Sequence, residues 1–286
     1  MRGPLSPLPT TGRQYLLVMP SRPGRHRHAS VALAWIRSAQ VDGPFMDSVL
    51  EVGDYDQLHQ GYLNRQKGGG RIVLQSSPRI AEARSQVVDN FLKEFPDADW
   101  LWWVDSDATF DGDVLARLME VAHYPDRPIV GALAFAGARA ANMYPTLYGA
   151  EQFEDGIEIT RPETDYPRDA LVKVAGTGCH CVVVHKQVFR ALAKSFATMP
   201  NGAPNPYPWY AEGLVDRKGA PIGEDMIFCW RARGLGIPTH VHTGIKTGHV
   251  KQAVLDEALW EERMVAKPLP PMQTKAAELP PLDLSA

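Results

Sequence analysis

The sequence is poor in cysteine and has no long hydrophobic run. Its three cysteines, Cys179, Cys181 and Cys229, are too few for a disulfide scaffold and fit thiols in a reducing compartment. The longest apolar stretch, IVGALAFAGA, falls short of the roughly 20 residues that a membrane helix needs. The N-terminus shows no apolar segment of the signal-peptide type. These absences predict a soluble, cytoplasmic protein without a membrane span.

The sequence also lacks an excess of positive charge. Its formal net charge of −3 gives no general attraction for nucleic acid. Residues 1–41 nevertheless contain six arginines and no acidic residue, and SRPGRHRH within them is a local basic segment suited to phosphate. That segment is too short to form a DNA-binding domain.

Strand and helix patterns alternate along the chain, which predicts an α/β fold with a sheet flanked by helices. Strands are expected within residues 14–20, 47–53, 68–77, 100–104, 128–136, 171–185 and 237–243. Helices are expected within residues 28–40, 77–95, 111–124, 186–196 and 223–236, with Ser77 and Pro78 opening the second of them. Residues 139–170 are expected to be an insertion with long loops.

The most apolar of these strands leads directly into two acids. In WLWWVDSDATF, residues 100–110, Asp105 and Asp107 stand where the strand ends, and ligands of open α/β sheets bind at such ends. Side chains at i and i+2 share a face, and two carboxylates so placed repel each other unless a cation lies between them. Mg²⁺ or Mn²⁺ together with a diphosphate would satisfy both acids. The alternative is an acidic turn that caps the next helix.

Two other metal sites can be weighed against this one. DATFDG, residues 107–112, matches the first half of an EF-hand loop, but its twelfth position is Leu118 instead of glutamate, and a strand precedes it instead of a helix. The calcium loop is therefore excluded. The Cys179/Cys181 and His240/His242 pairs have an i, i+2 spacing that matches no common zinc motif. We expect these four residues to be buried or cross-strand neighbours.

Three ordered segments resemble the GT-A-fold glycosyltransferases, particularly small family-2-like enzymes of bacteria and their phages. The segments are ARSQVVDNFLKEFPDADWLWWVDSDATF, VAGTGCHCVVVHKQVFRAL and GEDMIFCWRARGLGIPTHVHTGIKTGHV. The resemblance implies a single GT-A domain over residues 14–262, with a mixed, mostly parallel sheet, between a flexible N-terminus (1–13) and a proline-rich tail (263–286). It also implies transfer of a sugar from a nucleotide-diphosphate donor, with UDP as the commonest nucleotide.

The resemblance assigns a metal and donor site to the acidic motif. Asp107 is expected to be a direct ligand of Mn²⁺ or Mg²⁺, and Asp105 a contact to ribose or metal, with Ser106 between them on the donor. His249 of TGHV is expected to be a further metal ligand, or else an ordinary strand-end histidine.

The nucleotide itself is expected to meet residues on two other segments. Pro20, Ser21 and Arg22 follow the first expected strand and are candidate contacts to base and ribose. Arg84 resembles a helix residue that reaches the nucleotide, with a solvent-exposed helix arginine as the alternative. Ser85 replaces the asparagine of some relatives, which leaves that contact open.

The acceptor side is expected around the GED motif. Asp225 would be the general base of an inverting reaction, with Glu224 as an alternative base or an acceptor-positioning group. Both acids would also stabilise the N-terminus of their helix. For the acceptor itself, the candidate contacts are Gly176, Thr177, Gly178, Trp209 and Tyr210. The glycines could equally form a strand-entry turn, and the aromatic residues could equally pack their loop.

The sequence leaves open both the acceptor and the class of protein. A protein side chain, an envelope glycan and a hydroxylated base of phage DNA are all candidate acceptors. A nucleotidyltransferase is one alternative class, although VMPSRPGRHRH is not a convincing glycine-rich phosphate loop. A non-catalytic carbohydrate-binding or virion accessory protein is the other, since it would need neither the metal nor Asp225.

Overall fold

The fold is seen in a computed structural model. It describes residues 29–38, 40–59, 61–64, 71–75, 79–137, 143–161, 165–251 and 256–266. The strand expected at 14–20, the expected helix cap at Ser77 and Pro78, and the expected flexible segment 1–13 lie outside the described residues. Within the described part of the chain, no helix has both the length and the apolar character that crossing a membrane requires.

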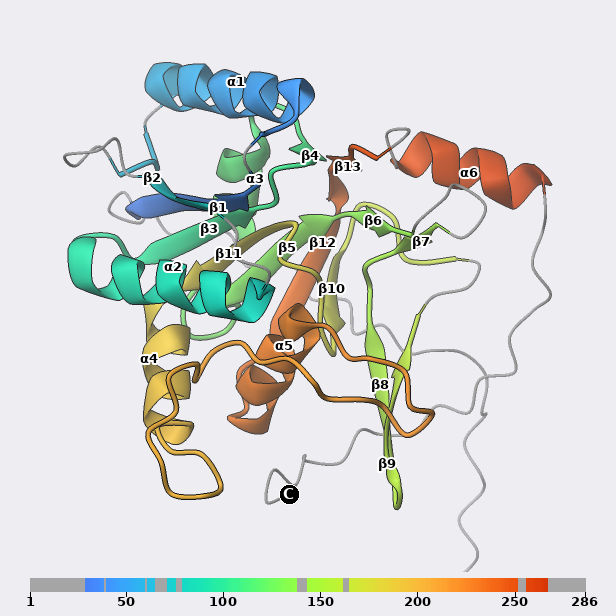
Figure 1. The fold of residues 1–286 in the computed structure, drawn as a ribbon. Coiled ribbons are helices and arrows are strands. Elements are labelled where there is room, and N and C mark those ends of the chain that lie inside the picture. Colours follow the sequence, from blue (N-terminus) through green and yellow to red (C-terminus); the bar gives the residue numbers. More distant parts are fainter. Residues whose placement is uncertain are drawn as a thin grey trace, which may run out of the picture.

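One seven-stranded sheet forms the centre of the molecule, in the order β10-β12-β5-β11-β3-β1-β2 (Figure 1). Its strands are β1 (Val31–Arg37), β2 (Arg71–Gln75), β3 (Trp100–Val104), β5 (Ile129–Leu133), β10 (Leu171–Val174), β11 (Cys181–His185) and β12 (Thr239–Lys246). Strands β12, β5, β3, β1 and β2 run in one direction, while β10 and β11 run in the other. The predicted α/β class with a mixed, mostly parallel sheet is confirmed.

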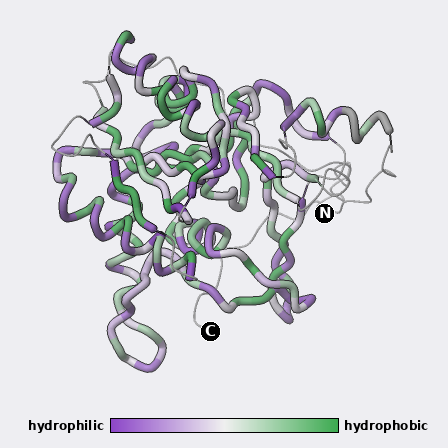
Figure 2. Tube along the Cα trace, turned by 45° about the horizontal axis from the view of Figure 1, so that its top comes forward, coloured by the Kyte–Doolittle hydropathy of each residue, from purple (hydrophilic) through white to green (hydrophobic). Residues whose placement is uncertain are grey.

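Helices cover both faces of this sheet. One face packs against α1 (Gly43–His59) and α3 (Val114–Val121), and the other against α2 (Ile80–Glu94), α4 (Lys186–Ser195) and α5 (Glu224–Gly234) (Figure 1). Strand β3 contributes Trp102 to the first core and Leu101 and Trp103 to the second. Figure 2 shows hydrophobic stretches gathered inside the molecule. Burial of each of these large β3 side chains contributes about 1.5–3 kcal/mol to the stability of the fold. Strand β3 is therefore a rigid base for the residues that follow it.

Short paired strands lie beyond the ends of the sheet. They are β4 (Ala108–Thr109) with β13 (Gly248–His249), β6 (Phe135–Ala136) with β7 (Tyr144–Pro145), and the hairpin β8 (Gly149–Phe153) with β9 (Gly156–Thr160). The β8–β9 hairpin falls within the expected insertion. Helix α6 (Glu257–Ala266) packs Trp260 against Phe135, and the expected domain boundary at residue 262 falls inside this helix.

Two element predictions near the N-terminus are wrong. The segment 28–40, expected to be a helix, contains strand β1, and the segment 47–53, expected to be a strand, is the middle of helix α1. Strand β1 lies between β2 and β3 with both faces covered, so it shows no alternation, and its alanines mimic a helix. In α1, buried Phe45, Val49 and Val52 recur at helical spacing, a period that a seven-residue window does not reveal.

Candidate functional site

The acidic motif lies where several strand ends meet. Asp105 and Asp107 follow β3, and His249 stands in β13, just after β12. Strand β11 runs antiparallel to β3 with Cys181 opposite Val104, so the residue before β11 faces the residue after β3. The amide of Asp105 accordingly donates to the carbonyl of His180 over 2.9 Å.

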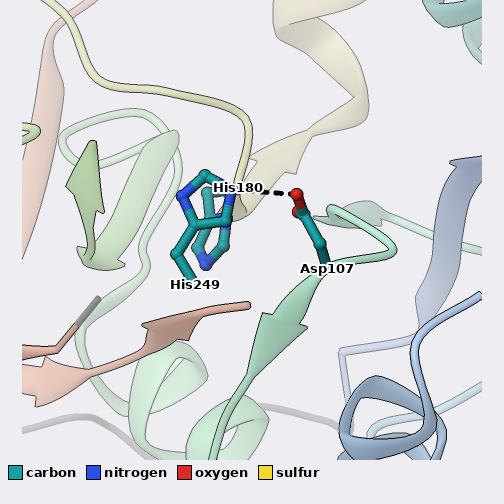
Figure 3. Close-up of side chains that lie close together, drawn as sticks. All are labelled: Asp107, His180 and His249. Carbon is teal, nitrogen blue, oxygen red and sulfur yellow. Dashed lines mark hydrogen bonds and ion pairs between the residues drawn. The ribbon is translucent and has the colours of Figure 1, made fainter. Parts of the chain in front are cut away.

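A second pairing brings His249 against the motif. In the two-stranded β4–β13 ribbon His249 lies opposite Ala108, and the amide of Val250 donates to the carbonyl of Asp107 over 2.7 Å. Figure 3 shows the resulting arrangement, in which the two histidine rings lie side by side and Asp107 faces them. Residues more than 130 positions apart in the sequence therefore share one site because of strand register.

Three side chains of this site have the composition of a metal centre. The ligand atoms of Asp107, His180 and His249 all lie within 4.8 Å of one another, and within the described part of the chain they are the one such group of three or more. His249 Nε2 is 3.0 Å from Asp107 Oδ2, which also accepts a 2.7 Å hydrogen bond from Lys251 Nζ. Burial alone would raise the pKa of Asp107, but these two hydrogen bonds outweigh it and lower that pKa.

His180 is a site residue that the sequence reasoning missed. Its ring is buried, its Nε2 lies 3.0 Å from the carbonyl oxygen of Gly248, and its Nδ1 lies 3.6 Å from Asp105 Oδ2. A separation of 3.6 Å is too long for a hydrogen bond. Among the described residues, Nδ1 has no hydrogen-bond partner. A buried ring nitrogen that has no hydrogen-bond partner and lies beside carboxylates can be satisfied by a cation, so these residues fit a metal ion.

Arg84 links the acidic motif to the GED motif. Its Nη2 lies 3.0 Å from Asp105 Oδ1 and its Nε lies 3.0 Å from Glu224 Oε1. The side chain is buried, which rules out the exposed-arginine alternative, and its guanidinium stacks 5.2 Å from the centre of the Trp103 ring. Burial would raise the pKa of Asp105, but the charge of Arg84 holds it well below its ordinary value. Asp105 is therefore an ionised carboxylate fixed by α2.

Asp225 is the one acid of the site with a raised pKa. It stands at the N-terminus of α5 beside Glu224, and its Oδ1 accepts a 2.7 Å hydrogen bond from the amide of Met226. Burial, followed by the charge of Glu224, raises its pKa to about 7. Since Glu224 is engaged by Arg84, Asp225 is the carboxylate better suited to exchange a proton near neutral pH.

The expected acceptor contacts divide into two groups. A Cβ added at Gly178 would lie 3.3 Å from Asp225 Oδ2, so Gly178 lines the space beside that acid. A Cβ at Gly176 would lie 2.6 Å from Met226 Sδ, and Thr177 is buried, so these two residues pack the strand entry. Trp209 and Tyr210 are also buried in the core. In this structure the packing alternative accounts for both aromatic residues, because no ring face is open to a sugar.

Pro20, Ser21 and Arg22 lie outside the described residues, and Ser106 occupies the partly exposed turn between the two aspartates. Cys179 and Cys181 belong to opposite cores of the sheet and are buried free thiols whose pKa is raised by burial. They form no zinc site together.

Comparison with known proteins gives one family match. Residues 74–119 match the model of the galactosyl transferase GMA12/MNN10 family, a segment that runs from the end of β2 through the acidic motif into α3. No curated protein matches the chain. The resemblance to glycosyltransferases predicted from the sequence is thus confirmed over the segment that carries Asp105 and Asp107.

Solved structures show more distant likenesses. A197 from STIV is 15% identical, with a TM-score of 0.48 over 80% of this chain and 91% of that chain. GalNAc-T7, solved with UDP, GalNAc and Mn²⁺, is 12% identical, with a TM-score of 0.49 over 78% of this chain. The chain spans 44% of that protein. The inositol-1-phosphate CTP transferase of T. maritima is 11% identical, with a TM-score of 0.41 over 83% of this chain and 96% of that chain. At such scores these likenesses decide nothing about activity.

Proposed function

We propose that the protein is a metal-dependent glycosyltransferase that moves a sugar from a nucleotide-diphosphate donor, a UDP-sugar in the first instance, to an acceptor hydroxyl. The observation that carries this proposal is the metal-ligand group of Asp107, His180 and His249, of which Asp107 lies inside the segment that matches a galactosyl transferase family. The raised pKa of Asp225, which interacts electrostatically with Asp105 and Arg84, adds a group suited to activating a hydroxyl.

The donor side combines the metal-ligand group with fixed charges. Asp107, His180 and His249 would hold Mn²⁺ or Mg²⁺, and a bound ion would neutralise the leaving diphosphate as a Lewis acid. Lys251 adds a cation beside Asp107 that can bind diphosphate oxygens. Arg84 holds Asp105 in one orientation, which keeps that carboxylate available to ribose or to water on the ion.

The acceptor side is centred on Asp225. In an inverting reaction Asp225 accepts the proton of the acceptor hydroxyl as that oxygen attacks the anomeric carbon. Its place at the N-terminus of α5 keeps the ionised form close to backbone amides. Gly178 leaves space beside its Oδ2, where the hydroxyl of a protein, an envelope glycan or a hydroxylated DNA base would fit.

A donor screen tests this function. Release of UDP or another nucleotide diphosphate is measured from a panel of nucleotide sugars, with and without Mn²⁺, for the unmodified protein and for Asp107→Asn. We expect metal-dependent release, first as slow hydrolysis and faster with acceptor, that Asp107→Asn abolishes. Release of pyrophosphate from nucleoside triphosphates would instead indicate a nucleotidyltransferase. Absence of nucleotide-sugar binding and turnover would refute the proposal.

A further inference from the structure

The ring of His180 is oriented by the backbone in a way that leaves one nitrogen for a ligand. A carbonyl oxygen only accepts hydrogen bonds, so the nitrogen 3.0 Å from Gly248 O, Nε2, carries a proton. The other ring nitrogen, Nδ1, is buried without a hydrogen-bond partner among the described residues and lies 3.6 Å from Asp105 Oδ2. A cation placed there would be attracted by both atoms.

His249 is held in the same manner from the opposite side. Its Nδ1 lies 3.1 Å from the carbonyl oxygen of Phe135, and its Nε2 points at Asp107 Oδ2. Metal-binding histidines commonly donate their second ring N–H to a backbone carbonyl, which fixes both the tautomer and the ring orientation. The two rings lie 4.6 Å apart between centres, and one ligand atom from each of them lies within 4.8 Å of a carboxylate oxygen of Asp107 (Figure 3).

The charges around the site leave room for a divalent cation. Four carboxylates, those of Asp105, Asp107, Glu224 and Asp225, lie close enough at this site to interact electrostatically. Two permanent cations, Arg84 and Lys251, pair with three of them. When Asp225 is ionised, two negative charges are left over.

Asp105 differs from the three candidate ligands, Asp107, His180 and His249. Its carboxylate is committed to Arg84, and it does not belong to the group whose ligand atoms lie within 4.8 Å of one another. The ligand set that remains is two imidazoles and one carboxylate. Imidazole nitrogen binds first-row transition ions well, whereas Mg²⁺ favours oxygen ligands.

We propose that His180 is a metal ligand and that, with Asp107 and His249, it makes the site select transition ions such as Mn²⁺ and Co²⁺ over Mg²⁺. Asp105 then acts as a positioning residue beside the ion. The inference rests on the metal site of the proposed function, but it concerns binding of the ion alone.

Metal titrations of the full chain without nucleotide sugar test this assignment. Mn²⁺ binding is followed by loss of the free-ion electron paramagnetic resonance signal, and Mg²⁺ affinity is measured by competition against Mn²⁺. His180→Gln is the informative variant because its amide can still donate to Gly248 O but has no atom in place of Nδ1. His59→Ala, at an exposed position in α1, is the matched control.

We expect the unmodified protein to bind Mn²⁺ at least about tenfold more tightly than Mg²⁺, and His180→Gln to lose about tenfold or more in Mn²⁺ affinity. His59→Ala should change neither value. Unchanged Mn²⁺ affinity in folded His180→Gln, together with loss in His249→Ala, would overturn the role of His180. If His180→Gln does not fold, pulsed resonance of bound Mn²⁺ in the unmodified protein decides, since two coupled imidazole nitrogens support the proposal and one overturns it.

The outcome is separable from that of the proposed function. Metal binding through His180 without any nucleotide-sugar turnover would keep this inference and refute the glycosyltransferase. Metal-dependent sugar transfer that His180→Gln leaves intact, with unchanged Mn²⁺ affinity, would keep the glycosyltransferase and refute the inference.

Discussion

The guanidinium of Arg84 lies 3.0 Å from the carboxylate of Asp105, and the same side chain reaches Glu224 with its Nε. One buried cation thereby joins the strand end that carries the acidic motif to the helix that begins with the candidate base. Because the Arg84 side chain is only 7% exposed, its charge is weakly screened by solvent. Changes at this residue should therefore affect folding and donor binding together.

Replacing Arg84 by methionine should destabilise the fold by about 2–4 kcal/mol, because two partly buried carboxylates lose their partner. Urea denaturation measures this loss. Arg84→Lys should recover only part of it, since its single nitrogen cannot occupy the positions of both Nη2 and Nε, which contact the two acids separately. In the double variant Arg84→Met/Glu224→Gln the cost should fall, because one orphaned charge is gone. An Arg84→Met protein as stable as the unmodified one would show that the three groups are not coupled.

Replacing Asp225, in contrast to replacing Arg84, should make the protein more stable at alkaline pH. Its pKa is about 7 in the folded protein, against an ordinary value of 3.8, so the folded state holds a proton that the unfolded state releases. Stability from this group therefore falls as pH rises between these values. Asp225→Asn should be more stable at pH 8 by about 1–3 kcal/mol, discounted for partial exposure, and no more stable near pH 4.

The same substitution should lower the rate of sugar transfer by about 10²–10⁴-fold. In the unmodified enzyme the rate should rise with pH through about 7, as Asp225 loses its proton. Asp54→Asn, at an exposed position of α1, serves as the control and should leave both the rate and the stability profile unchanged. An unchanged transfer rate in Asp225→Asn would exclude Asp225 as the base, and equal stability of Asp225→Asn and the parent at pH 8 would show that its pKa is not raised.

The parts of the fold that the sequence predicts correctly are those with strong local patterns. Strand β3 is a short apolar run ended by acids, and α2 and α5 are marked by an apolar stripe and by a glycine stop. The local pattern of strand β1 wrongly predicts a helix, because a strand covered on both faces loses its alternation. Its identity depends on β2 and β3 lying on either side of it, which no local pattern records.

The site shows the same limit at the level of single residues. Asp105, Asp107 and Asp225 stand at element ends that the sequence marks. His180 enters only because β11 pairs antiparallel with β3 in one register, and a shift of one residue would turn its side chain away. Trp209 and Tyr210 illustrate the converse error, since aromatic residues in a loop suggest a sugar platform but here anchor that loop in the core.

Gly178 should tolerate no side chain without loss of activity. A Cβ there would lie 3.3 Å from Asp225 Oδ2, which fills the space beside the candidate base. We expect Gly178→Ala to lower kcat about tenfold or more, since small displacements at a reacting group are costly. The measurement is steady-state transfer together with Mn²⁺ binding, which should be unchanged.

Gly53→Ala is the matched control for Gly178→Ala. A Cβ at Gly53 meets nothing within 4 Å, and the residue lies inside α1. This substitution should leave activity intact and raise stability by about 0.5–1 kcal/mol, because alanine is the better helix former. Equal activity of the two variants would mean that the space beside Asp225 is not used by substrate.

Lys251 should compete with the metal ion for Asp107. Its Nζ lies 2.7 Å from Asp107 Oδ2, so in the metal-free protein its ammonium neutralises the carboxylate that the ion would bind. Removing this partly exposed charge as Lys251→Met should raise Mn²⁺ affinity by about three- to tenfold, a difference of about 1 kcal/mol. In the unmodified protein the ion displaces the Lys251 ammonium from Asp107, which frees it to bind the diphosphate. The variant lacks this ammonium, so its affinity for UDP in the presence of Mn²⁺ should fall. Lys194→Met, on the exposed side of α4, controls for loss of surface charge. Weaker Mn²⁺ binding in Lys251→Met would mean that the lysine supports the ion instead of competing with it.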